Sequence, residues 1–231
     1  MQNHEATRKK AVRYSFLLIF QRVMGLACFL AAAGTLSSAR GWIFFALYFI
    51  LSALSLGIML KGHRQTLAAR TGQEGTMPWD KVFVPVYTLL HFYIIYIVAG
   101  LEVRFGVPVS GAVYLAFGIA LYVLSGLLGL WSITVNTHFE STARLQKDRG
   151  QRVVSDGPYG WVRHPGYLAI ILWCFAAGLM FGTRYVWIVS ALVMLLILVR
   201  TYLEDAMLLS GLSGYADYAR RVPYRLIPLI W

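Results

Sequence analysis

Residues 157–167, with the sequence GPYGWVRHPGY, combine groups that can bind an anion or a heterocycle. Two prolines and two glycines favour irregular backbone with uncommitted N–H and C=O groups: Pro158, Gly160, Pro165 and Gly166. Beside a bilayer, such backbone persists only where it is buried in protein or lines a cavity. N–H groups at a helix start bind anions, and three aromatic rings offer planar surfaces: Tyr159, Trp161 and Tyr167. The segment therefore predicts either a site for a nucleotide-like cofactor or a purely structural turn.

His164 stands directly before Pro165, which fits the first position of the next helix. A histidine at that position is either a helix cap or part of the same binding site. His91 has no ligand partner nearby in the sequence, so we interpret it as a packed, hydrogen-bonded structural histidine.

Arg200 and Glu204 are the second candidate pair, because residues four apart share one face of a helix. They could form an ion pair with each other at the membrane edge. Alternatively, ionisable groups at the end of a spanning helix mark a ligand pathway. An arginine could then hold a carboxylate or phosphate, and a glutamate an ammonium or ribose hydroxyls.

The motifs of the usual soluble cofactor folds are absent from the sequence. No G-x-G-x-x-G, phosphate-binding loop, H-E-x-x-H or C-x-x-C motif occurs, so we expect no Rossmann domain and no metal. Cys28 and Cys174 both lie in apolar runs and give no disulfide framework.

The elements that must position these groups are membrane helices. Of the 231 residues, 58% are hydrophobic, and the mean hydropathy is +0.62. A helix needs roughly 20 apolar residues to cross the hydrocarbon core. Four long runs meet this length and two further runs contain or border charges, at residues 42–60, 82–101, 111–139, 165–183, 14–36 and 185–199. We therefore expect an all-α, polytopic membrane bundle of about six transmembrane helices, the last continuing past Arg200.

The basic residues that give the chain its net charge of +11 are distributed as expected for membrane topology and not as expected for a nucleic-acid-binding surface. With a cytoplasmic N-terminus, the cytoplasmic segments hold sixteen Lys and Arg residues and the opposite side holds three. Both termini are then cytoplasmic, in the inner membrane of a bacterium or the endoplasmic reticulum of a eukaryote. Arg163 fits an interfacial or positive-inside anchor. We expect membrane lipids as partners, but neither nucleic acid nor an obligate protein partner.

The chain divides functionally near residue 110. Residues 1–110 are expected to be scaffold helices, with the polar connection 61–81 as a loop or lid. Residues 111–231 contain most of the titratable side chains that could do chemistry.

Three motifs occur in order in the second half: GPYGWVRHPGY, RTYLED and GYADYARRVPYRLIP. Together, over residues 136–231, they resemble the isoprenylcysteine carboxyl methyltransferase family, whose relatives include membrane phospholipid methyltransferases. The resemblance implies an S-adenosylmethionine pocket facing the cytosol, reached by a lipophilic substrate from the bilayer. It places cofactor contacts on Gln151, Arg152, Val153, Val154, Tyr159, His164, Pro165, Gly166, Tyr167 and Glu204, and makes Arg200 the substrate-facing arginine. Where the prenylcysteine enzymes have a run of acids, this chain has Thr201, Tyr202 and Leu203 before Glu204.

We therefore expect a membrane methyltransferase that uses S-adenosylmethionine on a lipid-like carboxylate, amine or thiol. Arg200 could orient a carboxylate or thiolate, whereas an amine must lose a proton, with Glu204 or a tyrosine as acceptor. Two other classes stay open. One is a sterol-type membrane reductase that uses NADPH, and the other is a channel or transporter without enzymatic activity.

Overall fold

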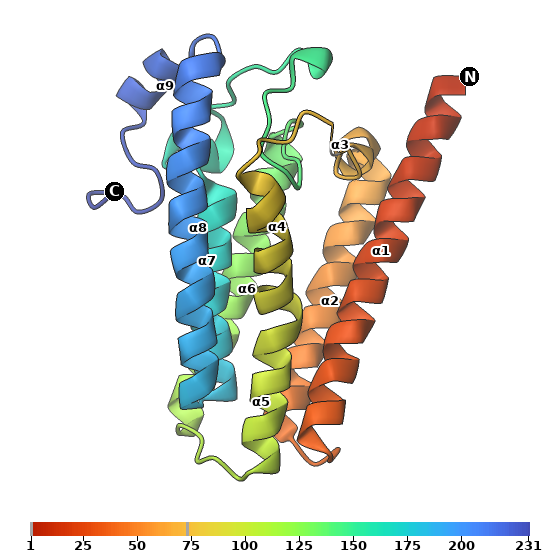
Figure 1. The fold of residues 1–231 in the computed structure, drawn as a ribbon, viewed down its shortest axis with the longest axis vertical. Coiled ribbons are helices and arrows are strands. Elements are labelled where there is room, and N and C mark those ends of the chain that lie inside the picture. Colours follow the sequence, from red (N-terminus) through yellow and green to blue (C-terminus); the bar gives the residue numbers. More distant parts are fainter. Residues whose placement is uncertain (1, 73) are drawn as a thin grey trace.

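The computed structural model describes residues 2–72 and 74–231, and their regular elements are all helical (Figure 1). The long helices run alternately up and down, and α9 lies at the same end of the bundle as the start of α1 (Figure 1). The elements are α1 (Gln2–Ala33), α2 (Ala39–Gly62), α3 (Arg64–Ala69), α4 (Asp80–Leu89), η1 (Leu90–Ile94), α5 (Ile95–Arg104), α6 (Ala112–Val135), η2 (Lys147–Arg149), η3 (Gly157–Gly160), α7 (Pro165–Phe181), α8 (Arg184–Gly211) and α9 (Tyr215–Arg221).

Five of the described helical stretches are long and apolar enough to cross a membrane. They are Glu5–Ala33, Ala39–Gly62, Asp80–Arg104, Ala112–Val135 and Arg184–Gly211. Helix α7 is also apolar but has only 17 residues, so it is about 26 Å long. The expected all-α polytopic bundle is confirmed, with five full-length candidate spans and a shorter sixth. Helix α8 also continues past Arg200, as the sequence predicts.

One predicted span, residues 82–101, is a composite of α4, the π-helical turn η1 and α5. Pro85 lies inside α4 and cannot donate a backbone hydrogen bond. His91 lies in η1, buried, with its ring 3.9 Å from that of Trp173 and 4.9 Å from that of Tyr87. The packing agrees with a structural histidine, but the expectation of a hydrogen-bonded ring is not met at Nδ1, which is buried without a hydrogen-bond partner among the described residues.

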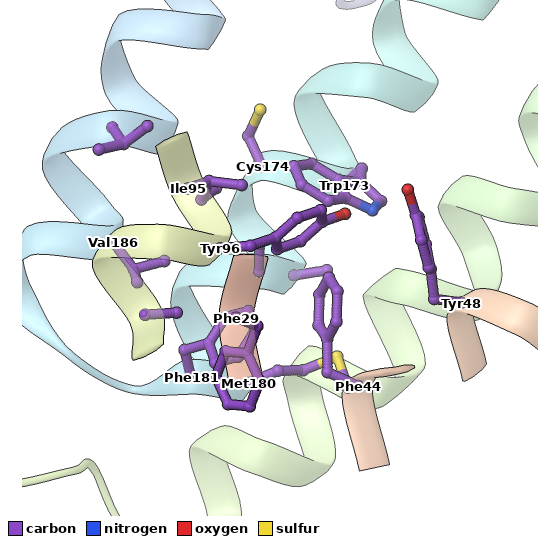
Figure 2. Close-up of a cluster of buried hydrophobic side chains, with 14 of the residues drawn as sticks. Phe29, Phe44, Tyr48, Ile95, Tyr96, Trp173, Cys174, Met180, Phe181 and Val186 are labelled. Atoms are coloured by element: carbon purple, nitrogen blue, oxygen red, sulfur yellow. The ribbon is translucent and has the colours of Figure 1, made fainter. Parts of the chain in front are cut away.

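The core of the bundle is aromatic, and it joins the two halves of the sequence. Phe44 of α2 is fully buried, and its ring centroid lies 4.6 Å from that of Phe181 and 5.7 Å from that of Tyr96 (Figure 2). The Tyr122 ring centroid lies 5.2 Å from it. Helices α6 and α7 approach closely at Gly118, where an added Cβ would lie 2.7 Å from the Met180 side chain. The division near residue 110 stays a functional interpretation, since this core crosses it.

The turn between α7 and α8 is held by charges that match the helix dipoles. Arg40 donates to the carbonyl oxygens of Met180 (3.0 Å) and Leu179 (3.5 Å), at the C-terminus of α7. Glu102 is 3% exposed and accepts hydrogen bonds from the N–H groups of Tyr185 (3.1 Å) and Val186 (3.3 Å). A cation at a helix C-terminus and an anion at an N-terminus are both stabilising.

We predict that Glu102→Ala lowers the free energy of unfolding by about 1–3 kcal/mol, because it leaves buried donors at the start of α8 unpaired. Thermal unfolding in detergent micelles measures this. Glu5→Ala is the matched control, since Glu5 forms an exposed ion pair with Lys9. Equal unfolding temperatures for the two variants would contradict the capping role of Glu102.

Candidate active site

A cavity of about 620 Å³ opens at the end of the bundle that holds α9 and the start of α1. One side is lined by the 136–154 loop, η3, α7 and α8, and the other by α1, α4 and η1, where Leu17, Leu18, Phe20 and Val84 form an apolar branch beside Arg13 and Gln21. Ligand pockets in proteins span about 300–1,000 Å³, so the volume suits a cofactor with part of a second molecule.

Asp205 of α8 organises the polar part of this region. It is fully buried and accepts two hydrogen bonds from Arg163, at 2.8 and 2.9 Å. It also accepts hydrogen bonds from Tyr215 (2.8 Å) and Arg225 (2.8 Å), and lies 3.2 Å from His164 Nε2. These five residues form the Asp205 network. It ties the GPYGWVRHPGY segment to α8, α9 and the C-terminal tail.

The prediction offered an interfacial or a positive-inside anchor for Arg163, and the interfacial alternative is wrong because the side chain is buried, while the positive-inside alternative stays a prediction. Arg163 is 7% exposed, and besides Asp205 its guanidinium donates to the carbonyl oxygens of Val222 (2.9 Å) and Pro223 (2.8 Å). Although burial disfavours its charge, the hydrogen bonds to Asp205 raise the pKa of Arg163 above its ordinary value. Asp205 lies 42 residues from Arg163 in the sequence, so the charge pattern around Arg163 gave no sign of this ion pair.

The cavity brings together ten of the eleven residues that the sequence singled out. The lining includes Gln151, Arg152, Val153, Val154, Tyr159, His164, Gly166, Tyr167, Arg200 and Glu204. Pro165 is not part of it; it is buried at the first turn of α7. The roles of all eleven in binding or catalysis stay predictions.

Residues at the start of α7 face Glu204 of α8 across the cavity. The Tyr167 hydroxyl donates a hydrogen bond to Glu204, and the Tyr167 and His164 rings lie nearly parallel, 5.7 Å apart. Gly166 packs on Phe139, and an added Cβ would overlap the Phe139 ring, so this position tolerates no side chain without rearrangement. Burial raises the pKa of Tyr159, which keeps its hydroxyl protonated.

Arg200 and Glu204 do not form the ion pair that the sequence left open. Among the described residues, Arg200 pairs instead with Asp80 of α4, with Nε 2.9 Å from Oδ1 and a hydrogen bond of 3.0 Å from Nη2 to Oδ2. Sequence reasoning missed Asp80, treating it as part of the 61–81 loop. The signal that could have identified Asp80 is its position as an ionisable residue at the edge of an apolar run. The same kind of position identified Arg200.

Ion pairs between its own residues stabilise the 136–154 loop, which lines the cavity. Arg144 contacts Glu140 (2.7 Å) and Asp148 (2.7 Å), and Arg149 also reaches Glu140 (2.9 Å). Burial lowers the pKa of His138, which lies 3.3 Å from the Gln146 amide oxygen, so its imidazole is neutral at pH 7. The loop is therefore an ordered part of the cavity.

We predict that Asp205→Asn lowers the free energy of unfolding by about 3–5 kcal/mol, because two guanidinium groups lose their buried counter-ion. Thermal unfolding in detergent checks this. Asp217→Asn is the control, because Asp217 pairs with Arg220 on the surface, and we expect its effect to stay within about 0.5 kcal/mol. A loss for Asp205→Asn no larger than the control's would contradict the central role of the network.

Comparisons with known proteins agree with the motifs. No curated protein matches the chain. Residues 118–210 match the model of the isoprenylcysteine carboxyl methyltransferase (ICMT) family. The matched segment contains most of α6, the loop over the cavity, α7 and nearly all of α8, and so Asp205, Arg200 and Glu204. Residues 118–210, which supply most of the polar side of the cavity, are therefore similar to the isoprenylcysteine carboxyl methyltransferase family, a family of membrane methyltransferases.

Proposed function

We propose that this protein transfers a methyl group from S-adenosylmethionine to a lipophilic acceptor at the membrane surface. One observation carries the proposal: a single cavity joins the polar surface of the family segment to an apolar branch between α1 and α4. The family match favours methyl transfer over reduction and over transport, the two classes that the sequence left open.

The polar part of the cavity fits the cofactor in size and in chemistry. Among the described residues, Glu204 accepts a hydrogen bond from Tyr167 alone, so its carboxylate can accept further hydrogen bonds from an amine or from ribose hydroxyls. Tyr159 and Tyr167 supply aromatic rings, and four residues separate the short helix η3 from the start of α7. S-adenosylmethionine supplies an electrophilic methyl group that a nucleophile displaces in line, so alignment is the main requirement.

The apolar branch supports entry of the acceptor from the bilayer. It is lined on one side by Leu17, Leu18 and Phe20 of α1, and on the other by Val84 and Thr88 of α4. Leu17 and Phe20 are also exposed on the outer surface of the bundle, where lipid chains would lie. An acyl or prenyl chain in this branch would hold its polar end beside Arg200 and Glu204.

The charge distribution supports a cytoplasmic position for the cavity. Several arginines line it, namely Arg13, Arg70, Arg144 and Arg152, and positively charged loops face the cytoplasm in membrane proteins. The donor is a soluble cytoplasmic metabolite, so a cytoplasmic opening would give it direct access.

We predict that the purified chain binds S-adenosylhomocysteine and that Glu204→Gln weakens this binding by at least about tenfold, through loss of a charged hydrogen-bond acceptor. Calorimetric titration measures both, with Asp217→Asn as the control that retains wild-type affinity. Absence of binding by the wild-type chain, or binding of NADPH alone, would overturn the methyltransferase proposal.

We also predict that Leu18→Trp raises the KM for a long-chain acceptor by about tenfold while leaving S-adenosylhomocysteine affinity unchanged, because an indole at that position narrows the apolar branch. Val113→Trp is the control: Val113 is 66% exposed on α6 and does not line the cavity. Initial rates of methyl transfer at varied acceptor concentration provide the test. An unchanged KM would show that the acceptor uses another route.

A further inference from the structure

We infer that Arg70 is an anion-binding residue of the cavity, where its guanidinium holds the negatively charged head of an amphiphile whose chain lies in the apolar branch. The inference rests on the proposed function and assigns this position to the acceptor. It also gives residues 1–110, which we expected to be a scaffold, a part in binding, because Arg70 lies outside the segment 118–210 that matches the family model.

Arg70 is a half-buried cation of the cavity lining without a counter-ion. All ten Asp and Glu residues of the chain belong to its described part, and none of them forms an ion pair with Arg70. Three other arginines of the lining do pair with acids, namely Arg144, Arg163 and Arg200. Arg13 and Arg152 also lack an acid partner among the described residues, but both are exposed. A guanidinium partly removed from water gains more from a bound anion than an exposed one does.

Neutral groups hold the Arg70 guanidinium in place. Its Nε donates to the Tyr14 hydroxyl at 2.8 Å, and its Nη1 to the Phe139 carbonyl oxygen at 3.4 Å. The guanidinium carbon lies 5.4 Å from the centre of the Tyr14 ring and 5.3 Å from that of the Phe139 ring. Nη2 donates to no described residue. The side chain is therefore oriented in advance, while its charge and one of its NH₂ groups stay available to a phosphate or carboxylate.

The backbone of Arg70 is fixed between α1 and the 136–154 loop. Arg70 directly follows α3, which packs on α1 in a buried cluster that contains Ala11 and Leu67 (Figure 1). The Arg70 carbonyl oxygen accepts a hydrogen bond from the Ser141 hydroxyl at 3.3 Å, and the Ser141 carbonyl oxygen accepts one from Arg200 at 3.0 Å. Ser141 thus contacts both arginines, so the position of Arg70 borders the part of the cavity that contains Arg200.

The apolar branch begins one helical turn from Arg70. Leu17 and Leu18 follow Tyr14 by three and four residues, so the three side chains share one face of α1, and all three line the cavity. An amphiphile with its chain along these leucines would therefore place its head beside Tyr14 and Arg70. Arg13 also lines the cavity here and adds a second positive charge at its opening.

The charges of the bound cofactor would leave Arg70 uncompensated. S-adenosylmethionine carries a sulfonium and an ammonium group against one carboxylate, so its net charge is positive. Glu204, which we assign to the cofactor, offsets that charge, and Asp80 offsets Arg200. Neither acid is then available to Arg70, so an anionic amphiphile would complete the charge balance of the loaded cavity.

The test uses the full chain loaded with S-adenosylhomocysteine in nanodiscs of phosphatidylcholine, which has no net charge. The probes are dodecyl phosphate, dodecanol with the same chain but no charge, and inorganic phosphate without a chain. Calorimetric titration, corrected with protein-free nanodiscs, is expected to show that dodecyl phosphate binds at least about tenfold more tightly than either of the others. Equal affinity for dodecanol, or for inorganic phosphate, would overturn the inference.

Arg70→Gln tests the residue itself. It removes the charge at similar length, so the affinity for dodecyl phosphate should fall at least about tenfold, while the affinities for dodecanol and S-adenosylhomocysteine stay unchanged. Arg70→Lys should retain part of the preference for dodecyl phosphate over dodecanol, because the charge remains. Arg64→Gln is the matched control: Arg64 is exposed on α3, does not line the cavity, and loses the same charge.

A purely structural role of Arg70, as a contact between α1 and the loop, predicts a different result. Arg70→Gln would then weaken the binding of all ligands together, or of none, and either result would contradict the inference. The preference for dodecyl phosphate over dodecanol is a ratio from one preparation, so it does not depend on the fraction of folded protein.

Two further measurements separate this inference from the proposed function. Failure of the wild-type chain to bind S-adenosylhomocysteine would contradict the proposed function, and the same probe titrations on the unloaded chain would then decide on Arg70. In a chain that transfers methyl groups to a lipid extract, dodecyl phosphate should inhibit competitively with the acceptor. Binding without such competition would assign the position to a lipid of the bilayer and overturn its role in holding the acceptor.

Discussion

The end of the bundle that holds α9 depends on contacts with the fully buried carboxylate of Asp205. Two guanidinium groups and a tyrosine hydroxyl hydrogen-bond to it, and His164 lies beside it, so one anion joins the start of α7, α8, α9 and the tail. Irregular backbone beside a bilayer needs internal partners, and this network supplies them to GPYGWVRHPGY. That segment can then expose part of its surface to a cavity without losing its position.

Much of the fold was predictable from the sequence, because membrane helices are local in origin. Apolar runs of sufficient length gave the spans, and the extension of α8 beyond Arg200 followed from the shortness of the run before it. The grouping of predicted site residues around one cavity followed from motifs within residues 136–231. Long-range electrostatic pairing was not predictable. Asp80 and Arg200 are 120 residues apart, and no local pattern distinguishes a partner in another helix from one four residues away.

The two ends of the bundle use charge differently. At one end, Glu102 caps the N-terminus of α8 and Arg40 caps the C-terminus of α7. Each charge offsets a helix dipole and is therefore not free to take part in a reaction. At the other end, Arg200, Glu204 and Thr142 lie around a cavity that also reaches lipid-facing α1. There Arg200 pairs with Asp80, and the Glu204 carboxylate suits a positively charged donor.

The most direct measurement of methyl transfer to a lipophilic acceptor follows the methyl group itself. The purified chain would be incubated with a total membrane lipid extract and S-adenosylmethionine carrying a tritiated methyl group, and the products partitioned between organic and aqueous phases. We expect tritium in the organic phase, in step with the formation of S-adenosylhomocysteine, and at least about tenfold less with Glu204→Gln at a donor concentration below saturation. Tritium confined to the aqueous phase, with no S-adenosylhomocysteine formed, would contradict the proposed activity.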